Sequence, residues 1–426
     1  MRRILSILFL FFIWSVTCWS QELKEKLESL SGISQIETLN SADFSEKYLV
    51  RISQAIDPKD PSAGTFTQRV VVCHVGFDRP TVIVTEGYGG AYAQSSHYRD
   101  ELSKLFNTNI IHVEHRYFLE STPEALNWDY LTAENSAYDL HHVTTTFKQV
   151  YPEKWISTGI SKGGQTVMIY RSFFPDDVDI SVPYVAPLCW GVEDGRHEVF
   201  LKKVGTKSER KQILNFQKEV LKRRNTMVPM LESFCKEKEL TFRVPIEEVL
   251  DYCVLEYDFA FWQWGSNVNT IPSIKAEDKE LFDHLMKISG PDYFADEQPL
   301  GSFFVQAARE LGYYGYNTKP FKKLLSINGS DGYLTRIMLP ESAKNTKFNQ
   351  SLYYKIYNYL KYNDPKMLFI YGEIDPWSAP MAPRFKGRKN TQFYIQPRGS
   401  HSSRISNMPD ETKDKIIVQI TAWLEE

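Results

Sequence analysis

Strand-like runs of β-branched residues alternate with amphipathic stretches through the first half of this chain. The expected strands are residues 81–84, 109–113, 155–158 and 180–185, and the expected helices between them are residues 97–106, 132–151 and 165–174. Strands that alternate with helices form a mainly parallel sheet with helices on its faces. The sequence therefore predicts an α/β fold.

The same reading divides the chain into two core parts around an insertion. Residues 48–56 and 66–75 are expected to open the sheet as an antiparallel hairpin. Long charged helical patterns then replace the alternation, and we expect helices at 208–224, 246–262 and 277–288. Strand patterns return at 367–371 and 392–395, before a final helix at 409–424. We expect a core at 21–189 and 362–426 and a helical cap at 190–361.

A G-x-S-x-G sequence at residues 159–163 lies between an expected strand and an expected helix. This context is typical of the nucleophile turn in an α/β-hydrolase, where glycines permit a tight turn and Ser161 is exposed at its apex. The backbone N–H of Lys162 would point at the oxyanion that forms during acyl transfer. We expect the second oxyanion donor from Gly87 or Tyr88, in the glycine-rich loop after strand 81–84.

A serine hydroxyl is a weak nucleophile and needs a general base, which an acid must orient. In this fold the chain order is serine, acid, histidine. Of the three histidines after Ser161, two lie in the predicted cap, and His401 follows the expected strand 392–395 through a loop. The acid should follow strand 367–371, where Asp375 is our choice and Glu373 is the alternative. The predicted triad is Ser161, Asp375 and His401.

Four motifs carry a resemblance to a known family. They are residues 159–164 (Gly-Ile-Ser-Lys-Gly-Gly), 114–118 (Glu-His-Arg-Tyr-Phe), 371–377 (Tyr-Gly-Glu-Ile-Asp-Pro-Trp) and 400–405 (Ser-His-Ser-Ser-Arg-Ile). They resemble motifs of the secreted bacterial tripeptidyl aminopeptidases of the α/β-hydrolase clan. The lysosomal Pro-X carboxypeptidase and dipeptidyl peptidase relatives are more distantly similar, because they share a Ser-Tyr-Gly-Gly nucleophile motif where this chain has Lys162. The resemblance implies release of tripeptides from a free N-terminus, often after proline.

An enzyme that acts on free N-termini needs a fixed anion for the substrate ammonium. Glu86 and Glu114 each follow an expected strand at the edge of the sheet where ligands bind, and Glu134 is a third candidate. Two of them have structural alternatives: Glu114 can pair with Arg116, and Glu134 lies in the first turn of a helix, where any acidic residue is favoured.

Aromatic residues in the predicted cap, among them Trp262 and Trp264, are candidates to line an apolar subsite, and helix packing explains them equally well. The leading hypothesis is a serine exopeptidase that acts on peptides. The alternative is a carboxylic ester hydrolase with the same triad, because an aromatic pocket also accepts acyl chains. A binding protein on a hydrolase scaffold is the third hypothesis.

The N-terminus predicts export. Two arginines precede an apolar run at 4–16, and residues 1–20 are typical of a signal peptide. We expect a secreted or periplasmic protein, with lipidation at Cys18 as the alternative and no membrane association unless Cys18 carries a lipid. The formal net charge of −3 gives no reason to expect nucleic acid as a partner.

Four cysteines remain after the signal peptide, namely Cys73, Cys189, Cys235 and Cys253. An even number in an exported chain allows one or two disulfides, and the alternative is four buried thiols. Their spacings match no zinc pattern, and His112 and His115 would point to opposite faces of a strand. We expect no metal and no cofactor.

Overall fold

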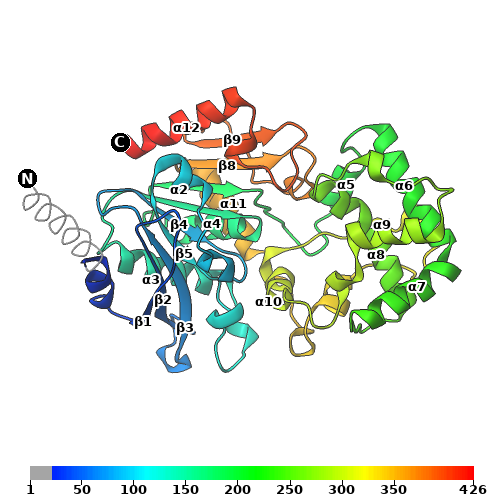
Figure 1. Cartoon of the computed structure of the whole chain (residues 1–426), viewed down its shortest axis with the longest axis horizontal. Coiled ribbons are helices and arrows are strands. Elements are labelled where there is room, and N and C mark those ends of the chain that lie inside the picture. The colour runs from blue at the N-terminus through cyan, green and yellow to red at the C-terminus, as the bar shows by residue number, and fades with distance from the viewer. Residues whose placement is uncertain (1–21) are drawn as a thin grey trace, which may run out of the picture.

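The computed structural model describes residues 22–426, which contain a nine-stranded sheet (Figure 1). The strands are β1 (Ile33–Thr38), β2 (Glu46–Ala55), β3 (Thr65–His74), β4 (Thr81–Thr85), β5 (Asn109–Val113), β6 (Trp155–Ile160), β7 (Ile180–Tyr184), β8 (Met367–Gly372) and β9 (Thr391–Gln396). Their order across the sheet is β1-β2-β3-β5-β4-β6-β7-β8-β9. The first three strands pair antiparallel, as does β3 with β5, and the neighbours from β5 to β9 are all parallel. The predicted α/β-hydrolase sheet is confirmed.

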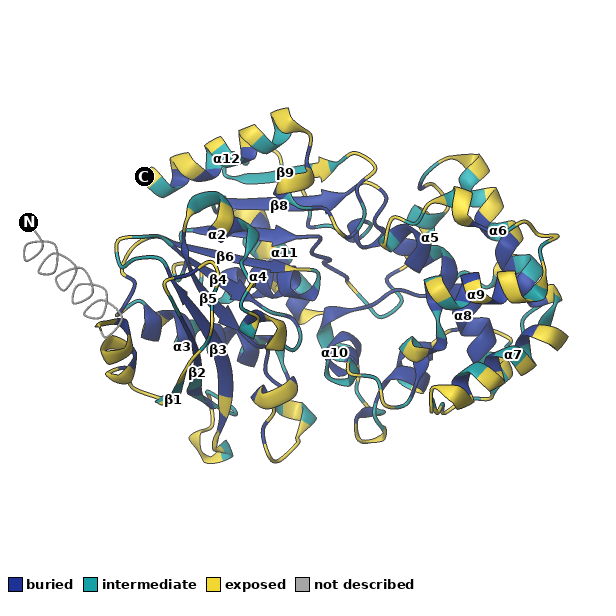
Figure 2. Cartoon of the chain, in the orientation of Figure 1, coloured by how far each residue is buried: buried dark blue, intermediate teal, exposed yellow. Residues whose placement is uncertain are grey.

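Helices cover both faces of this sheet. The helices are α2 (Glu101–Phe106), α3 (Ala133–Phe147), α4 (Lys162–Phe173), α5 (Arg196–Leu201), α6 (Lys207–Lys222), α7 (Arg224–Glu237), α8 (Ile246–Gln263), α9 (Asp278–Ser289), α10 (Gly301–Gln306), α11 (Ser351–Tyr362) and α12 (Asp410–Glu425). Successive residues of a strand face opposite sides. On β4, Val82 packs in one core with α2 and α12, whereas Ile83 packs in another core with α3. Figure 2 accordingly shows the central strands as buried.

The segment between β7 and β8 is largely helical, and α5 to α9 lie to one side of the sheet in Figure 1. Within this segment, α8 packs against α6, α7 and α9. By contrast, α11 packs against α4, which lies on the sheet. The division at residues 190 and 361 remains a prediction, and the packing of α11 places that helix beside the core.

Local expectations differ from the structure at a few points. Strand β1 was not expected, because its partly exposed, polar sequence on the sheet edge resembles a loop. The helix expected from residue 97 begins at Glu101, because the side chain of Asp100 accepts a hydrogen bond from the Leu102 N–H and caps it. All four cysteines have free thiols in the structure, so the allowed disulfides are not formed. Each of them is buried, as the alternative expected.

The predicted signal peptide and Cys18 fall among the residues that the structure leaves undescribed. From residue 22 onward, no helix combines the length and the apolar character needed to cross a bilayer.

Candidate functional site

Ser161 occupies the sharp turn between β6 and α4, as the G-x-S-x-G motif predicts. Its backbone has φ 58° and ψ −120°, and its N–H donates to the Tyr184 carbonyl at 2.9 Å. The turn requires glycine on both sides: a Cβ on Gly159 would lie 2.5 Å from the Gly163 carbonyl, and one on Gly163 would lie 2.8 Å from the Thr85 oxygen. The strained turn thereby places Ser161 at the carboxyl ends of the parallel strands.

Asp375 and His401 meet in two loops that follow β8 and β9. The Oδ2 atom of Asp375 lies 2.7 Å from Nδ1 of His401, and both side chains are buried. The other oxygen, Oδ1, accepts a hydrogen bond from the Trp377 N–H at 3.1 Å. Glu373, the alternative acid, is exposed and accepts a hydrogen bond from the Arg398 N–H instead. The geometry therefore pairs His401 with Asp375 and leaves its Nε2 atom for another partner.

A cavity of about 1210 Å³ joins these residues. Its wall includes both Ser161 and His401, together with Glu86, Tyr88 and the exposed ring of Trp264. The Trp264 and His401 rings meet edge to face, with their centroids 5.9 Å apart. The sheet thus provides one side of the cavity, and the helical segment between β7 and β8 provides the other.

The Lys162 side chain ties the nucleophile turn to the loop after β4. It is buried, and its Nζ donates to the Gly87 carbonyl at 2.5 Å. The same Nζ lies 5.7 Å from the centroid of the Tyr88 ring and 5.4 Å from that of the Phe118 ring. Burial lowers the pKa of Lys162 to about 7. The sequence predicted a role only for the Lys162 backbone N–H, as an oxyanion donor. The contact between its side chain and the Gly87 loop was not predicted.

The predicted oxyanion donors differ in their availability. Lys162 is the first residue of α4, so its N–H has no partner within the helix. The Gly87 and Tyr88 N–H groups donate to Oε1 of Glu86, at 2.8 and 3.3 Å. The Tyr88 side chain interacts with Ser161. In this structure the Gly87 and Tyr88 N–H groups are hydrogen-bonded to Glu86. Their role as oxyanion donors therefore remains a prediction.

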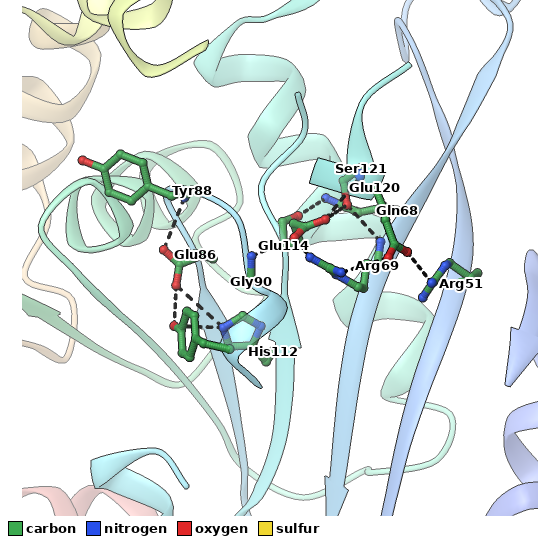
Figure 3. Close-up of polar contacts among 11 residues, drawn as sticks. Arg51, Gln68, Arg69, Glu86, Tyr88, Gly90, His112, Glu114, Glu120 and Ser121 are labelled. Atoms are coloured by element: carbon green, nitrogen blue, oxygen red, sulfur yellow. Dashed lines mark hydrogen bonds and ion pairs between the residues drawn. The ribbon is translucent and has the colours of Figure 1, made fainter. Parts of the chain in front are cut away.

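Glu86 is the one predicted ammonium ligand of the three that lines the large cavity. Its Oε2 accepts a hydrogen bond from the Tyr92 phenol at 2.5 Å and lies 3.7 Å from Nε2 of His112 (Figure 3). Burial raises the pKa of Glu86, but the interactions with His112, Tyr92 and the Gly87 N–H outweigh this effect and lower it. Glu86 is therefore a carboxylate with several partners already in place.

Glu114 is held in a separate, buried network (Figure 3). It forms an ion pair with Arg69, accepts hydrogen bonds from the Gly90 N–H at 2.7 Å and from the Ser121 hydroxyl at 2.9 Å, and is absent from the wall of the large cavity. The expectation that Glu114 pairs with Arg116 is wrong, because Arg116 binds Asp139. The geometry assigns Glu114 to holding β3, β5 and the Gly90 loop together.

Two other predicted residues also lie away from the large cavity. Glu134 pairs with Lys59 at 2.7 Å on the surface. Trp262 is buried and lines a different cavity, one of about 220 Å³ within the helical segment, whereas Trp264 faces Ser161 and His401. The structure thus brings Ser161, His401, Glu86, Tyr88 and Trp264 into one cavity wall and places Asp375 behind His401.

Most residues of the cavity wall were not predicted from the sequence, and the buried acid Glu256 is one of them. Glu256 on α8 lines the cavity and is 6% exposed, and its Oε2 accepts hydrogen bonds from the phenols of Tyr314 and Tyr316. The sequence alone does not single out Glu256, because α8 also carries Asp251 and Asp258; its place in the cavity wall is seen only in the structure. Buried acidic residues are rare unless they are paired, so such a position indicates a functional site.

Comparison with known proteins identifies the family of this chain. The model of the PS-10 peptidase S37 family matches residues 18–425. A prolyl tri/tetrapeptidyl aminopeptidase from Streptomyces mobaraensis is 30% identical over 420 residues, which are 96% of this chain and 86% of the relative. Among solved structures, a proline iminopeptidase from Mycobacterium smegmatis aligns over 92% of this chain and 99% of its own, with 11% identity and a TM-score of 0.38. An esterase from Pyrococcus furiosus aligns over 92% of both chains, with 10% identity and a TM-score of 0.37. The chain belongs to the PS-10 peptidase S37 family and is a serine peptidase of the tripeptidyl aminopeptidase type.

Proposed function

We propose that the protein is an exported exopeptidase that releases short peptides from free N-termini through an acyl-enzyme on Ser161. The observation that carries this proposal is the 2.7 Å contact between Asp375 and His401 at the wall of a cavity that Ser161 also lines. The resemblance of the nucleophile motif and the family membership support the same reaction class.

The chemistry follows from which imidazole nitrogen is free. Because Nδ1 of His401 faces Asp375, its Nε2 is the atom that accepts the Ser161 proton as the hydroxyl attacks the substrate carbonyl. Asp375 holds the ring in the required tautomer and stabilises the imidazolium. The imidazolium then gives its proton to the departing amine, and a water molecule, deprotonated by His401, hydrolyses the acyl-enzyme.

The oxyanion of each tetrahedral intermediate would lie against the Lys162 N–H at the start of α4. The second donor is the N–H of Gly87 or Tyr88. This N–H must break its hydrogen bond to Glu86 before it can donate to the oxyanion. The Lys162 side chain supports this arrangement, because it fixes the Gly87 carbonyl and with it the loop that carries both donors.

The substrate proposal is a tripeptide unit with proline before the scissile bond. The name of the Streptomyces relative, a prolyl tri/tetrapeptidyl aminopeptidase, supports both the length and the proline preference. Export through residues 1–20 follows from the charged and apolar pattern of the N-terminus.

A matched pair of peptides tests this function. One peptide has a free N-terminus with proline at the third position, and the other is identical except for an acetylated amine. We expect the acetylated peptide to be cleaved at least about 100-fold more slowly, because it lacks the charge that a buried anion would bind. Mass spectrometry of the products reads the cleavage length and the residue before the cut. Equal rates for the two peptides, or rapid hydrolysis of short esters without peptide turnover, would contradict the exopeptidase proposal.

A further inference from the structure

One face of α8 forms part of the cavity wall. Glu256, Ala260, Gln263 and the following residue Trp264 all line the cavity that contains Ser161 and His401. Their spacing of four, three and one residues places them on a single helical face. The opposite side of the helix, with Asp258 and Trp262, lines the smaller cavity.

The C-terminal end of this face is fixed at the catalytic histidine loop. The His401 N–H donates to the Gln263 carbonyl at 2.8 Å, and the Trp264 ring contacts the His401 ring. Glu256 lies seven residues earlier, which is about 10.5 Å along a helix that rises about 1.5 Å per residue. The helix therefore holds the buried carboxyl group of Glu256 at a fixed distance from the loop that carries His401.

The contacts of Glu256 leave one of its carboxyl oxygens available to bind a cation. Both phenols, of Tyr314 and Tyr316, donate to Oε2, and no residue from 22 to 426 forms a hydrogen bond with Oε1. Within the same described range, no lysine, arginine or histidine forms an ion pair with Glu256. The rings of Tyr293 and Tyr314 also face this cavity, and aromatic faces attract an ammonium group.

We propose that Glu256 binds the terminal ammonium of the substrate and that α8 sets the distance from it to the scissile bond. Three extended residues span about 10–11 Å, which matches the length of helix between Glu256 and Gln263. This inference rests on the proposed exopeptidase function and specifies its substrate subsite: a peptide whose charged N-terminus lies about three residues before the cleaved bond.

The surroundings of Glu256 predict how binding responds to pH. The titratable groups that interact with it are Tyr293, Tyr313, Tyr314, Tyr316 and Tyr333, together with Cys253 and Asp258 on α8 itself. Burial raises the pKa of Glu256 to about 8, so the empty enzyme holds it largely protonated at neutral pH. A bound ammonium favours the carboxylate, so KM for a free-amine peptide should fall as pH rises toward 8. It should rise again above that, because an α-amino group loses its own proton at about pH 8.

The test compares Glu256→Gln with Asp258→Asn. Each variant removes an acidic group of α8 whose pKa is raised. Glu256 lines the cavity that contains Ser161, whereas Asp258 lines the smaller cavity. For each protein, kcat/KM is measured for the free and the acetylated peptide, and the ratio of the two values is compared. We expect Glu256→Gln to lower this ratio by about 10- to 100-fold, through KM rather than kcat, because it removes a charge-assisted contact. It should also abolish the fall in KM toward pH 8 and broaden the length of the released peptides.

Asp258→Asn should keep the wild-type ratio and product length. Because it removes a charge that raises the pKa of Glu256, it should only move the fall in KM to lower pH and not abolish it. Stoichiometric labelling with a fluorophosphonate gives the fraction of folded, reactive enzyme in each preparation. A wild-type enzyme that discriminates between the two peptides, together with a Glu256→Gln variant that discriminates equally well, would overturn the assignment of Glu256 alone. A wild-type enzyme that does not discriminate would overturn the exopeptidase function and, with it, this subsite.

Discussion

Ser161 adopts a backbone conformation that few non-glycine residues occupy, with a φ of 58°. Such strain costs about 1–3 kcal/mol and persists only where the surroundings enforce it. Here the contact from the Ser161 N–H to the Tyr184 carbonyl and the close packing around Gly163 hold the turn. The motif predicted this geometry, because its glycines are the residues that permit so tight a turn next to Ser161. The motif did not predict the Lys162 contact with Gly87, because that contact joins residues 75 positions apart.

The two carboxylates of the loop after β8 allow a direct test of the assigned acid. Asp375→Asn should lower kcat by about 10⁴-fold, because the amide no longer selects the catalytic tautomer of His401. Glu373→Gln is the matched control: its side chain faces Arg398 and solvent, so kcat should stay near the wild-type value. Steady-state kinetics on the free-amine peptide measures both. A larger loss in Glu373→Gln than in Asp375→Asn would reverse the assignment.

The elements around the site are joined by side chains that cross from one strand to another. Arg69 on β3 reaches Glu114 after β5, and Glu114 in turn holds the Gly90 loop and Ser121 (Figure 3). The sequence places Glu114 correctly at the end of a strand. It does not show that the side chain points toward β3, because that direction depends on the order of strands in the sheet.

Glu114 and Glu134, both candidate ammonium ligands in the sequence, should therefore differ in their effect on stability. Glu114→Gln should lower the free energy of unfolding by about 3–5 kcal/mol, because it leaves the buried Arg69 guanidinium without its closest anion. Glu134→Gln removes a surface pair with Lys59 and should cost less than about 1 kcal/mol. Chemical denaturation measures both values. Similar losses in the two variants would mean that the buried network contributes little.

In the molecule as a whole, the sheet and the helical segment supply opposite walls of the cavity. The alternation of strands and helices predicted a mainly parallel sheet, and Ser161, Asp375 and His401 follow the carboxyl ends of β6, β8 and β9 at the same edge. The position of α8 over that edge depends on contacts between distant segments, such as the one from His401 to Gln263, and these leave no local pattern. For this reason the sequence indicated Ser161, Asp375 and His401 but missed Glu256 and placed Trp262 at the wrong cavity.

The assignment of Ser161 as the nucleophile is tested by mapping the residue that a fluorophosphonate modifies in the purified enzyme. Tryptic digestion and mass spectrometry should find one adduct, on the peptide that contains Ser161. Ser161→Ala should abolish the adduct and peptide turnover together, and His401→Ala should slow labelling strongly, because the hydroxyl loses its general base. An adduct on another residue, or full turnover by Ser161→Ala, would contradict the assigned nucleophile.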